Sequence, residues 1–188
     1  VTWNGRESLH TVRADEPVLL GDQPPEDGRW KQRGRSGPIR EVFADRFVFV
    51  YGGEEGGPSW QKALQAARDW FYFAQGVPDV VAADDITDEL MKSANLVLYG
   101  TVEDNPLIAR IAPELPVTVR DGRYVVGERS FDASRYGLSV IYPNPLAPER
   151  YVVLNAGHVW GTGISVNHKY DMLPDFIIFT EESVYDGT

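Results

Sequence analysis

The chain has 188 residues, enough for one domain with a substantial core and an added terminal segment. Its 28 acidic and 18 basic residues give a net charge of −10, which repels nucleic-acid backbones and anionic membranes. It contains no cysteine, which excludes disulfides, thiolate nucleophiles and cysteine zinc sites. No apolar run approaches the roughly 20 residues that span a bilayer. We therefore expect a soluble globular protein with no nucleic-acid or membrane partner.

Residues 1–29 are expected to form a short strand segment followed by a connector. The apolar residues Val1 and Trp3 alternate with polar ones, and the segment DQPPEDG at 22–28 has the composition of a linker. We expect the compact domain over 30–188. Because the chain begins with Val1 rather than methionine and has no signal-like segment, we expect a processed product, the end of a preceding module, or part of a longer polypeptide.

Strands and helices alternate in the first half of the compact domain. RFVFVY, at 46–51, is a continuous apolar run typical of a strand buried on both faces. A glycine loop follows it, and WQKALQAARDWFYFAQG then repeats apolar residues at helical spacing, including Trp60, Trp70 and Phe71, which we expect in the core. DVVAADDI and NLVLY indicate two more strands, TDELMKS a short helix, and DNPLIARIAPEL a helix with proline at its first position.

Strands dominate beyond Pro116. The candidates are PVTVR, RYVVG, ERSFD, GLSVIYP, RYVVLNAG and DFIIFTEE. A proline-rich turn joins two of them, and we expect its prolines, Pro143, Pro145 and Pro148, to lie outside the central pairing. The pattern predicts an α/β domain of three layers, with a Rossmann-like or flavodoxin-like mixed sheet and added antiparallel strands.

Two loops indicate a ligand-facing edge. If the strands before them are parallel, their ends share the edge at which open α/β sheets bind ligands. The residues are Gly52, Gly53, Gly100 and Thr101. The first loop lacks the spacings of nucleotide-binding motifs, and Glu54 and Glu55 put negative charge where a phosphate would lie. A surface turn is the preferred interpretation, and no cofactor is predicted.

Asn155 and His158 follow a buried strand and are expected at the same edge. A histidine there could act as an acid, a base or a metal ligand, although a structural or surface role is the commoner one. His158, His168 and Asp171 could in principle hold zinc, but their spacing matches no compact motif. No metal site is predicted.

Two further functions stay open at this point. GLSVI around Ser139 and GISVN around Ser165 are half-matches to the GxSxG elbow of serine hydrolases. An independent hydrolase would therefore use His158 with Ser139 or Ser165. A carbohydrate-binding module would instead use exposed aromatic residues, for which the candidates are Trp3, Trp30 and Trp160.

Three blocks of sequence carry a resemblance to a known family. They are SGPIREVFADRFVFVYG, NLVLYGTVEDNPLIARIAPELPV and YVVGERSFDASRYGLSVIYPNPLAPERYVVLNAGH. Over roughly Asp27 to Thr180 the chain resembles the C-terminal region of bacterial exported α/β-hydrolases of the prolyl-oligopeptidase-like or esterase-like kind.

The resemblance implies a non-catalytic accessory domain of a larger secreted or periplasmic serine hydrolase, either a peptidase or an esterase. In those proteins the catalytic serine domain precedes this region, so the implied partner is a hydrolase domain of the same polypeptide, on which this domain packs or which it orients or gates. No GxSxG elbow is present in this chain, and the resemblance transfers no catalytic residue to it.

Overall fold

A computed structural model describes residues 35–162, 164 and 167–183, together with 2, 3, 6, 7, 9, 11, 13 and 31. Only the backbone is described at 2, 3, 6, 167 and 168. Strands β1 (Thr2–Trp3) and β2 (Arg6–Glu7) form an antiparallel pair. In the part of the chain that is described, no helix is long and apolar enough to cross a membrane.

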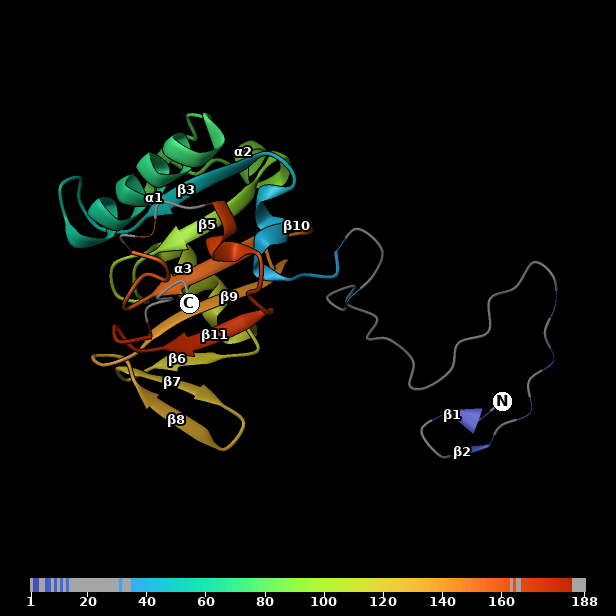
Figure 1. Ribbon diagram of the computed structural model, residues 1–188. Helices are drawn as coiled ribbons and strands as arrows, with labels where there is room; N and C mark the ends of the chain where they lie inside the picture. Colours follow the sequence, from blue (N-terminus) through green and yellow to red (C-terminus); the bar gives the residue numbers. More distant parts are fainter. Residues whose placement is uncertain are drawn as a thin grey trace.

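The centre of the compact domain is a six-stranded mixed sheet in the order β11-β9-β10-β5-β3-β4 (Figure 1). Its strands are β3 (Phe47–Tyr51), β4 (Val80–Ala82), β5 (Asn95–Tyr99), β9 (Gly137–Asn144), β10 (Ala147–Ala156) and β11 (Phe176–Phe179). The neighbouring strands β4, β3, β5 and β10 are parallel, whereas β9 is antiparallel to both β10 and β11. The predicted mixed, partly parallel sheet is confirmed.

Helices cover both faces of this sheet. Helix α1 (Pro58–Ala74) and the 3-10 helix η1 (Ile39–Phe43) share one core with alternate strand residues such as Phe49 and Val97. The opposite core contains the intervening residues, such as Leu98, with α2 (Asp88–Ser93) and α3 (Pro106–Ile111). The short turns η2 (Ala83–Asp85) and η3 (Ala112–Glu114) lie beside α3 and β6. The α/β class follows from apolar runs that are buried on both faces.

A second, antiparallel sheet consists of β6 (Thr118–Arg120), β7 (Arg123–Val126) and β8 (Arg129–Asp132). The turn between β6 and β7 has positive φ at both Asp121 and Gly122, which is the backbone of a tight hairpin turn. Tyr124 on β7 is buried, and the small sheet thereby extends the core that contains α3.

Helix α1 corrects the prediction of its apolar stripe. The residues that it buries against the sheet are small, namely Ala63, Ala66 and Ala67, because the helix lies close to the strands. Phe71 was expected in the core but is 47% exposed. Its position lies one residue beyond Trp70, which packs in the core, so it is turned about 100° away around the helix.

The prediction for the proline-rich turn was wrong for one of its three prolines, because Pro143 is paired in the sheet, whereas Pro148 has no ladder partner. Pro143 lies within β9 opposite Tyr151, and Pro148 lies within β10. The pairing register shifts between Ala147 and Tyr151, and such an irregularity admits residues that donate no ladder hydrogen bond. The segment DVVAADDI was predicted to be a strand throughout, but β4 covers only Val80–Ala82, and the exposed Asp84 and Asp85 belong to η2.

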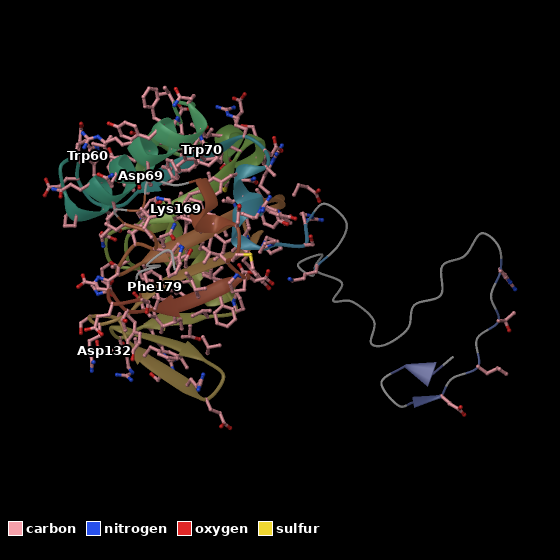
Figure 2. All side chains as sticks on the ribbon, viewed as in Figure 1. Trp60, Asp69, Trp70, Asp132, Lys169 and Phe179 are labelled. Carbon is pink, nitrogen blue, oxygen red and sulfur yellow. The ribbon has the colours of Figure 1, made fainter. Side chains whose placement is uncertain are left out.

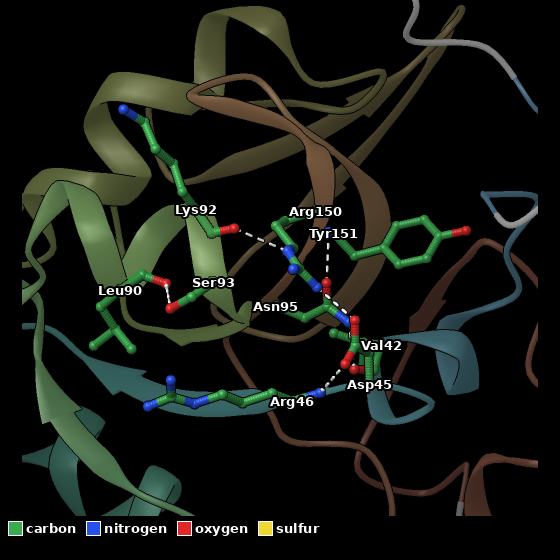
Figure 3. A network of polar contacts seen from close by, with 9 residues as sticks. All are labelled: Val42, Asp45, Arg46, Leu90, Lys92, Ser93, Asn95, Arg150 and Tyr151. Carbon is green, nitrogen blue, oxygen red and sulfur yellow. Dashed lines mark hydrogen bonds and ion pairs between the residues drawn. The ribbon is translucent and has the colours of Figure 1, made fainter.

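A polar network fixes the amino-terminal end of β5 (Figure 3). Asn95 Nδ2 donates to the Val42 carbonyl at 2.9 Å, and its Oδ1 accepts the backbone N–H of Tyr151 at 2.9 Å. Arg150 Nε donates to the Lys92 carbonyl at 3.0 Å, and its guanidinium pairs with Asp45. These contacts join η1, α2, β5 and β10 at the amino-terminal end of β5.

Candidate functional site

The carboxyl ends of three parallel strands lie side by side, as the sequence pattern required. Tyr51 at the end of β3 is in register with Tyr99 of β5, which is in register with Asn155 of β10. The chain passes from β3 to β4 on one side of β3, and the next strand, β5, then pairs with the opposite side of β3. In open α/β sheets such a reversal of direction creates a crevice between the loops that follow the two strands.

The carboxylate of Asp104 occupies this crevice. Its Oδ1 accepts hydrogen bonds from the backbone N–H and the hydroxyl of Thr101, at 2.5 and 3.1 Å. Its Oδ2 accepts the hydroxyl of Ser59, in the first turn of α1, at 2.8 Å. The Asp104 carbonyl accepts the N–H of Gly53 at 2.7 Å. A negative group of the chain itself thus lies at a helix N-terminus, where an anionic ligand would otherwise bind.

The glycines of the edge allow this close approach. A Cβ atom added at Gly52 would lie 2.5 Å from the Asp104 carbonyl oxygen, and one at Gly100 would lie 2.7 Å from Asp104 Oδ1. Gly100 also has a φ of +137°, which side chains disfavour. Glu54 and Glu55 are exposed, so the negative charge that faces this crevice comes from Asp104 instead.

Lys62 links helix α1 to the loop that follows β10. Its ammonium donates to the Gly157 carbonyl at 2.7 Å. Half-burial of the side chain lowers the pKa of Lys62, and the nearby Asp104 carboxylate opposes part of this shift. The lysine therefore brings a second, opposite charge to the same edge.

His158 follows β10 and faces a carboxylate. Its Nδ1 lies 2.9 Å from Oε1 of Glu181, and the two side chains are 30% and 75% exposed. A carboxylate in this position orients an imidazole for proton transfer. Asn155, by contrast, lies within β10 between Tyr99 and Ser139 and is half-buried. Neither residue contacts Asp104 in any described interaction, so the predicted edge divides into two parts.

Of the two candidate nucleophilic serines, only Ser139 lies within the described residues. Ser139 is only 3% exposed and lies in the middle of β9, opposite Asn155 on one side and Ile177 on the other. A hydroxyl held inside a sheet in this way is poorly placed to attack a substrate. Ser165 lies outside the described residues. Among the residues that are described, no serine hydroxyl bonds to His158.

The residues considered for zinc are not brought together by any described contact. Asp171 forms an ion pair with Arg40 at 3.2 Å, and the side chain of His168 lies outside the described part. Of the aromatic candidates, Trp30 and the side chain of Trp3 also lie outside it. Trp160 is half-buried, donates its indole N–H to the Lys169 carbonyl at 2.8 Å, and packs edge-on against Phe179.

A buried ion pair ties the same loop region to α1. Lys169 Nζ lies 2.8 Å from Asp69 Oδ2, and the two side chains are 3% and 7% exposed. Gln65 donates to the other carboxylate oxygen at 2.8 Å. Figure 2 shows Asp69 and Lys169 together between the helix and the red strand-loop region. The pair holds the segment around η4 (Asn167–Tyr170) against the helix.

Four polar residues of this region escaped the sequence analysis: Ser59, Lys62, Asp69 and Lys169. Asp104 entered that analysis only as the first residue of the segment DNPLIARIAPEL, and the cap of the helix there is Asn105, which accepts the N–H groups of Leu107 and Ile108. A local signal existed for Asp104, because an aspartate three residues after Thr101 can bond back to that residue. No local signal existed for the Asp69–Lys169 pair, whose members are 100 residues apart.

Comparisons of the chain with protein-family models, with curated proteins and with solved structures found no match.

Proposed function

We propose that the chain is a non-catalytic accessory domain of a larger secreted or periplasmic bacterial serine hydrolase, a peptidase or an esterase. In this proposal it packs on the hydrolase domain of the same polypeptide and orients or gates it. The proposal includes a flavodoxin-like arrangement, which the strand order β4-β3-β5-β10 supports. The sequence blocks that resemble the C-terminal region of such hydrolases supply the hydrolase part of the proposal.

The main support for a non-catalytic role is that Asp104 closes the crevice between the loops after β3 and β5. In an α/β sheet with this reversal, the position between the loops after β3 and β5 is the usual ligand site. Here the Asp104 carboxylate fills it with three side-chain hydrogen bonds. A site whose donors are already satisfied by the chain gains little from a ligand, because binding would exchange one set of hydrogen bonds for another.

The experiment compares fluorophosphonate labelling of two samples by mass spectrometry. The first is the 188-residue chain, and the second is the native polypeptide recovered with an antibody against residues 35–183. We expect no adduct on the chain and one adduct on the native polypeptide, at a serine outside these residues. Absence of an adduct from both samples would contradict the hydrolase assignment.

The His158–Glu181 contact favours one rival, an independent hydrolase, because the carboxylate orients the imidazole. In that case the chain itself would acquire an adduct at Ser165. Loss of the adduct in Ser165→Ala, with hydrolysis of p-nitrophenyl acetate lost in parallel, would replace the accessory-domain proposal. Ser139→Ala is the matched control, since its hydroxyl is buried in β9.

A further inference from the structure

Two neighbouring hollows form one groove beside helix α1. The larger has a volume of about 600 Å³ and the smaller about 420 Å³. They share the lining residues Lys62, Val159, Trp160 and Thr162, and therefore lie next to each other. We call this feature the α1 groove. It extends from the buried Asp69–Lys169 pair at one end to His158 and Glu181 at the other.

The walls of the groove are tied to each other. Lys62 on α1 bonds to the Gly157 carbonyl, and Lys169 bonds to Asp69 on α1. The indole N–H of Trp160 bonds to the carbonyl of Lys169. Two contacts therefore fix the loop wall against the helix wall, and the third holds two parts of the loop together. Such a site is preformed, and its ligand need not supply the free energy to order it.

The polar groups of the groove include both donors and acceptors of hydrogen bonds. The ammonium of Lys62 has three N–H donors, of which the described contacts use one, to Gly157. Glu181 offers carboxylate oxygens, and its contact with His158 Nδ1 leaves Nε2 as the nitrogen that a ligand would meet. Charges of opposite sign thus alternate along the groove, which suits a neutral ligand rich in groups that both donate and accept.

Aromatic side chains supply the apolar part of the lining. Trp160 stands where the two hollows meet, and its indole N–H is already used, so the ring offers apolar contact. Trp60 of α1 lines the larger hollow and Phe179 the smaller. The C–H face of a pyranose ring packs on an aromatic ring while its hydroxyl groups bond to surrounding polar side chains.

Other ligand classes fit the groove less well. The basic residues of the lining, Lys62, Arg68 and Lys169, are accompanied by the carboxylates of Asp69 and Glu181, and the whole chain has a net charge of −10, so the groove offers a polyanion no strongly cationic surface. An extended peptide that binds by adding a strand to a sheet needs free backbone groups, and the helix wall of this groove offers none because its backbone groups bond within the helix. We propose that the α1 groove binds a neutral oligosaccharide. This site is independent of the proposed hydrolase role.

The test is isothermal titration of the 188-residue chain with four neutral probes, namely cellohexaose, xylohexaose, mannohexaose and maltohexaose. We expect saturable, sub-millimolar binding of at least one probe. Lys62→Met and Trp160→Ala should each weaken that binding by about tenfold or more. Tyr72→Ala is the matched control, because Tyr72 is also aromatic and on α1 but is 70% exposed and outside the groove.

The melting temperature of each variant shows whether it folds. If Trp160→Ala does not fold, Glu181→Gln takes its place beside Lys62→Met, since Glu181 is largely exposed. Three outcomes would overturn the proposal: no binding of any probe, binding unchanged in both groove variants, or preferential binding of a hexagalacturonate or an extended hexapeptide. None of these outcomes alters the result of the fluorophosphonate experiment, so the two proposals fail separately.

Discussion

Ser59 Oγ donates a 2.8 Å hydrogen bond to Asp104 Oδ2 and so joins the first turn of α1 to the loop after β5, across 45 residues of sequence. The hydroxyl belongs to a residue that is only 5% exposed. This contact closes the crevice between the loops that follow β3 and β5, where the strand order reverses, and ties it to the core of the domain. The accessory role that we propose depends on this closure.

Removal of the carboxylate should destabilise the domain. We expect Asp104→Ala to lower the free energy of unfolding by about 1–3 kcal/mol, chiefly because it leaves the part-buried Ser59 hydroxyl without its acceptor, whereas the exposed N–H of Thr101 can bond to water. Ser59→Ala should cost about 1 kcal/mol. Since the two residues are in contact, the double variant should cost less than the sum of the single ones by about 0.5 kcal/mol or more. Urea unfolding measures all three, and strict additivity would contradict the contact.

Gly52 should tolerate no side chain. Because an added Cβ would lie 2.5 Å from the Asp104 carbonyl oxygen, we expect Gly52→Ala to destabilise the domain by about 2 kcal/mol or more. Gly122→Ala is the control: its φ of +66° is strained for alanine but nothing lies within 4 Å of the added atom. That variant should cost only about 1 kcal/mol. Equal costs, measured by thermal unfolding, would argue against a close approach at Gly52.

The Asp69–Lys169 pair predicts an asymmetry between single and double variants. Asp69→Leu leaves the buried ammonium of Lys169 without its partner and should cost about 3–5 kcal/mol. The double variant Asp69→Leu with Lys169→Met removes both charges and should recover most of this loss. Circular dichroism during urea unfolding provides the comparison. If the double variant is no more stable than Asp69→Leu, the pair contributes to the free energy of unfolding by more than the neutralisation of each charge by the other.

Stability should fall in strong base. Burial raises the pKa of Tyr124 to about 12, and that of Tyr151 to about 12 as well. A tyrosine in the unfolded chain has a pKa of about 10. The unfolded state therefore releases protons first, so this contribution to stability is complete below pH 10 and is lost as the pH rises toward 12. Tyr124→Phe should flatten the decline of the urea midpoint over this range, whereas parallel curves would contradict the assignment.

Local patterns were sufficient to predict much of the fold. The buried strands β3 and β5 are largely apolar runs, and a glycine follows each of them. Asn105 with Pro106 marks the start of α3. Each of these signals consists of residues that are close together in the sequence, so the sequence alone is enough to predict the element. They also sufficed to bring Gly52 and Gly100 to one edge of the sheet.

Contacts between distant segments could not be predicted in the same way. The pairing of Lys169 with Asp69 depends on how the loop after β10 folds back on α1, and no spacing records it. The presence of Pro143 in the ladder depends on the register shift opposite it. The exposure of Phe71 depends on which face of α1 packs on the sheet. In each case tertiary packing overrides the local pattern.

The most direct test of the closed crevice is a nuclear magnetic resonance titration of the ¹⁵N-labelled chain with inorganic phosphate, ATP and FMN at millimolar concentrations. The amide groups of Gly53 and Thr101 are the probes, because both donate hydrogen bonds to Asp104. We predict that their signals stay unchanged with all three compounds. Saturable shifts of both signals would mean that a ligand displaces the Asp104 carboxylate, and would contradict the account of a closed, non-catalytic edge.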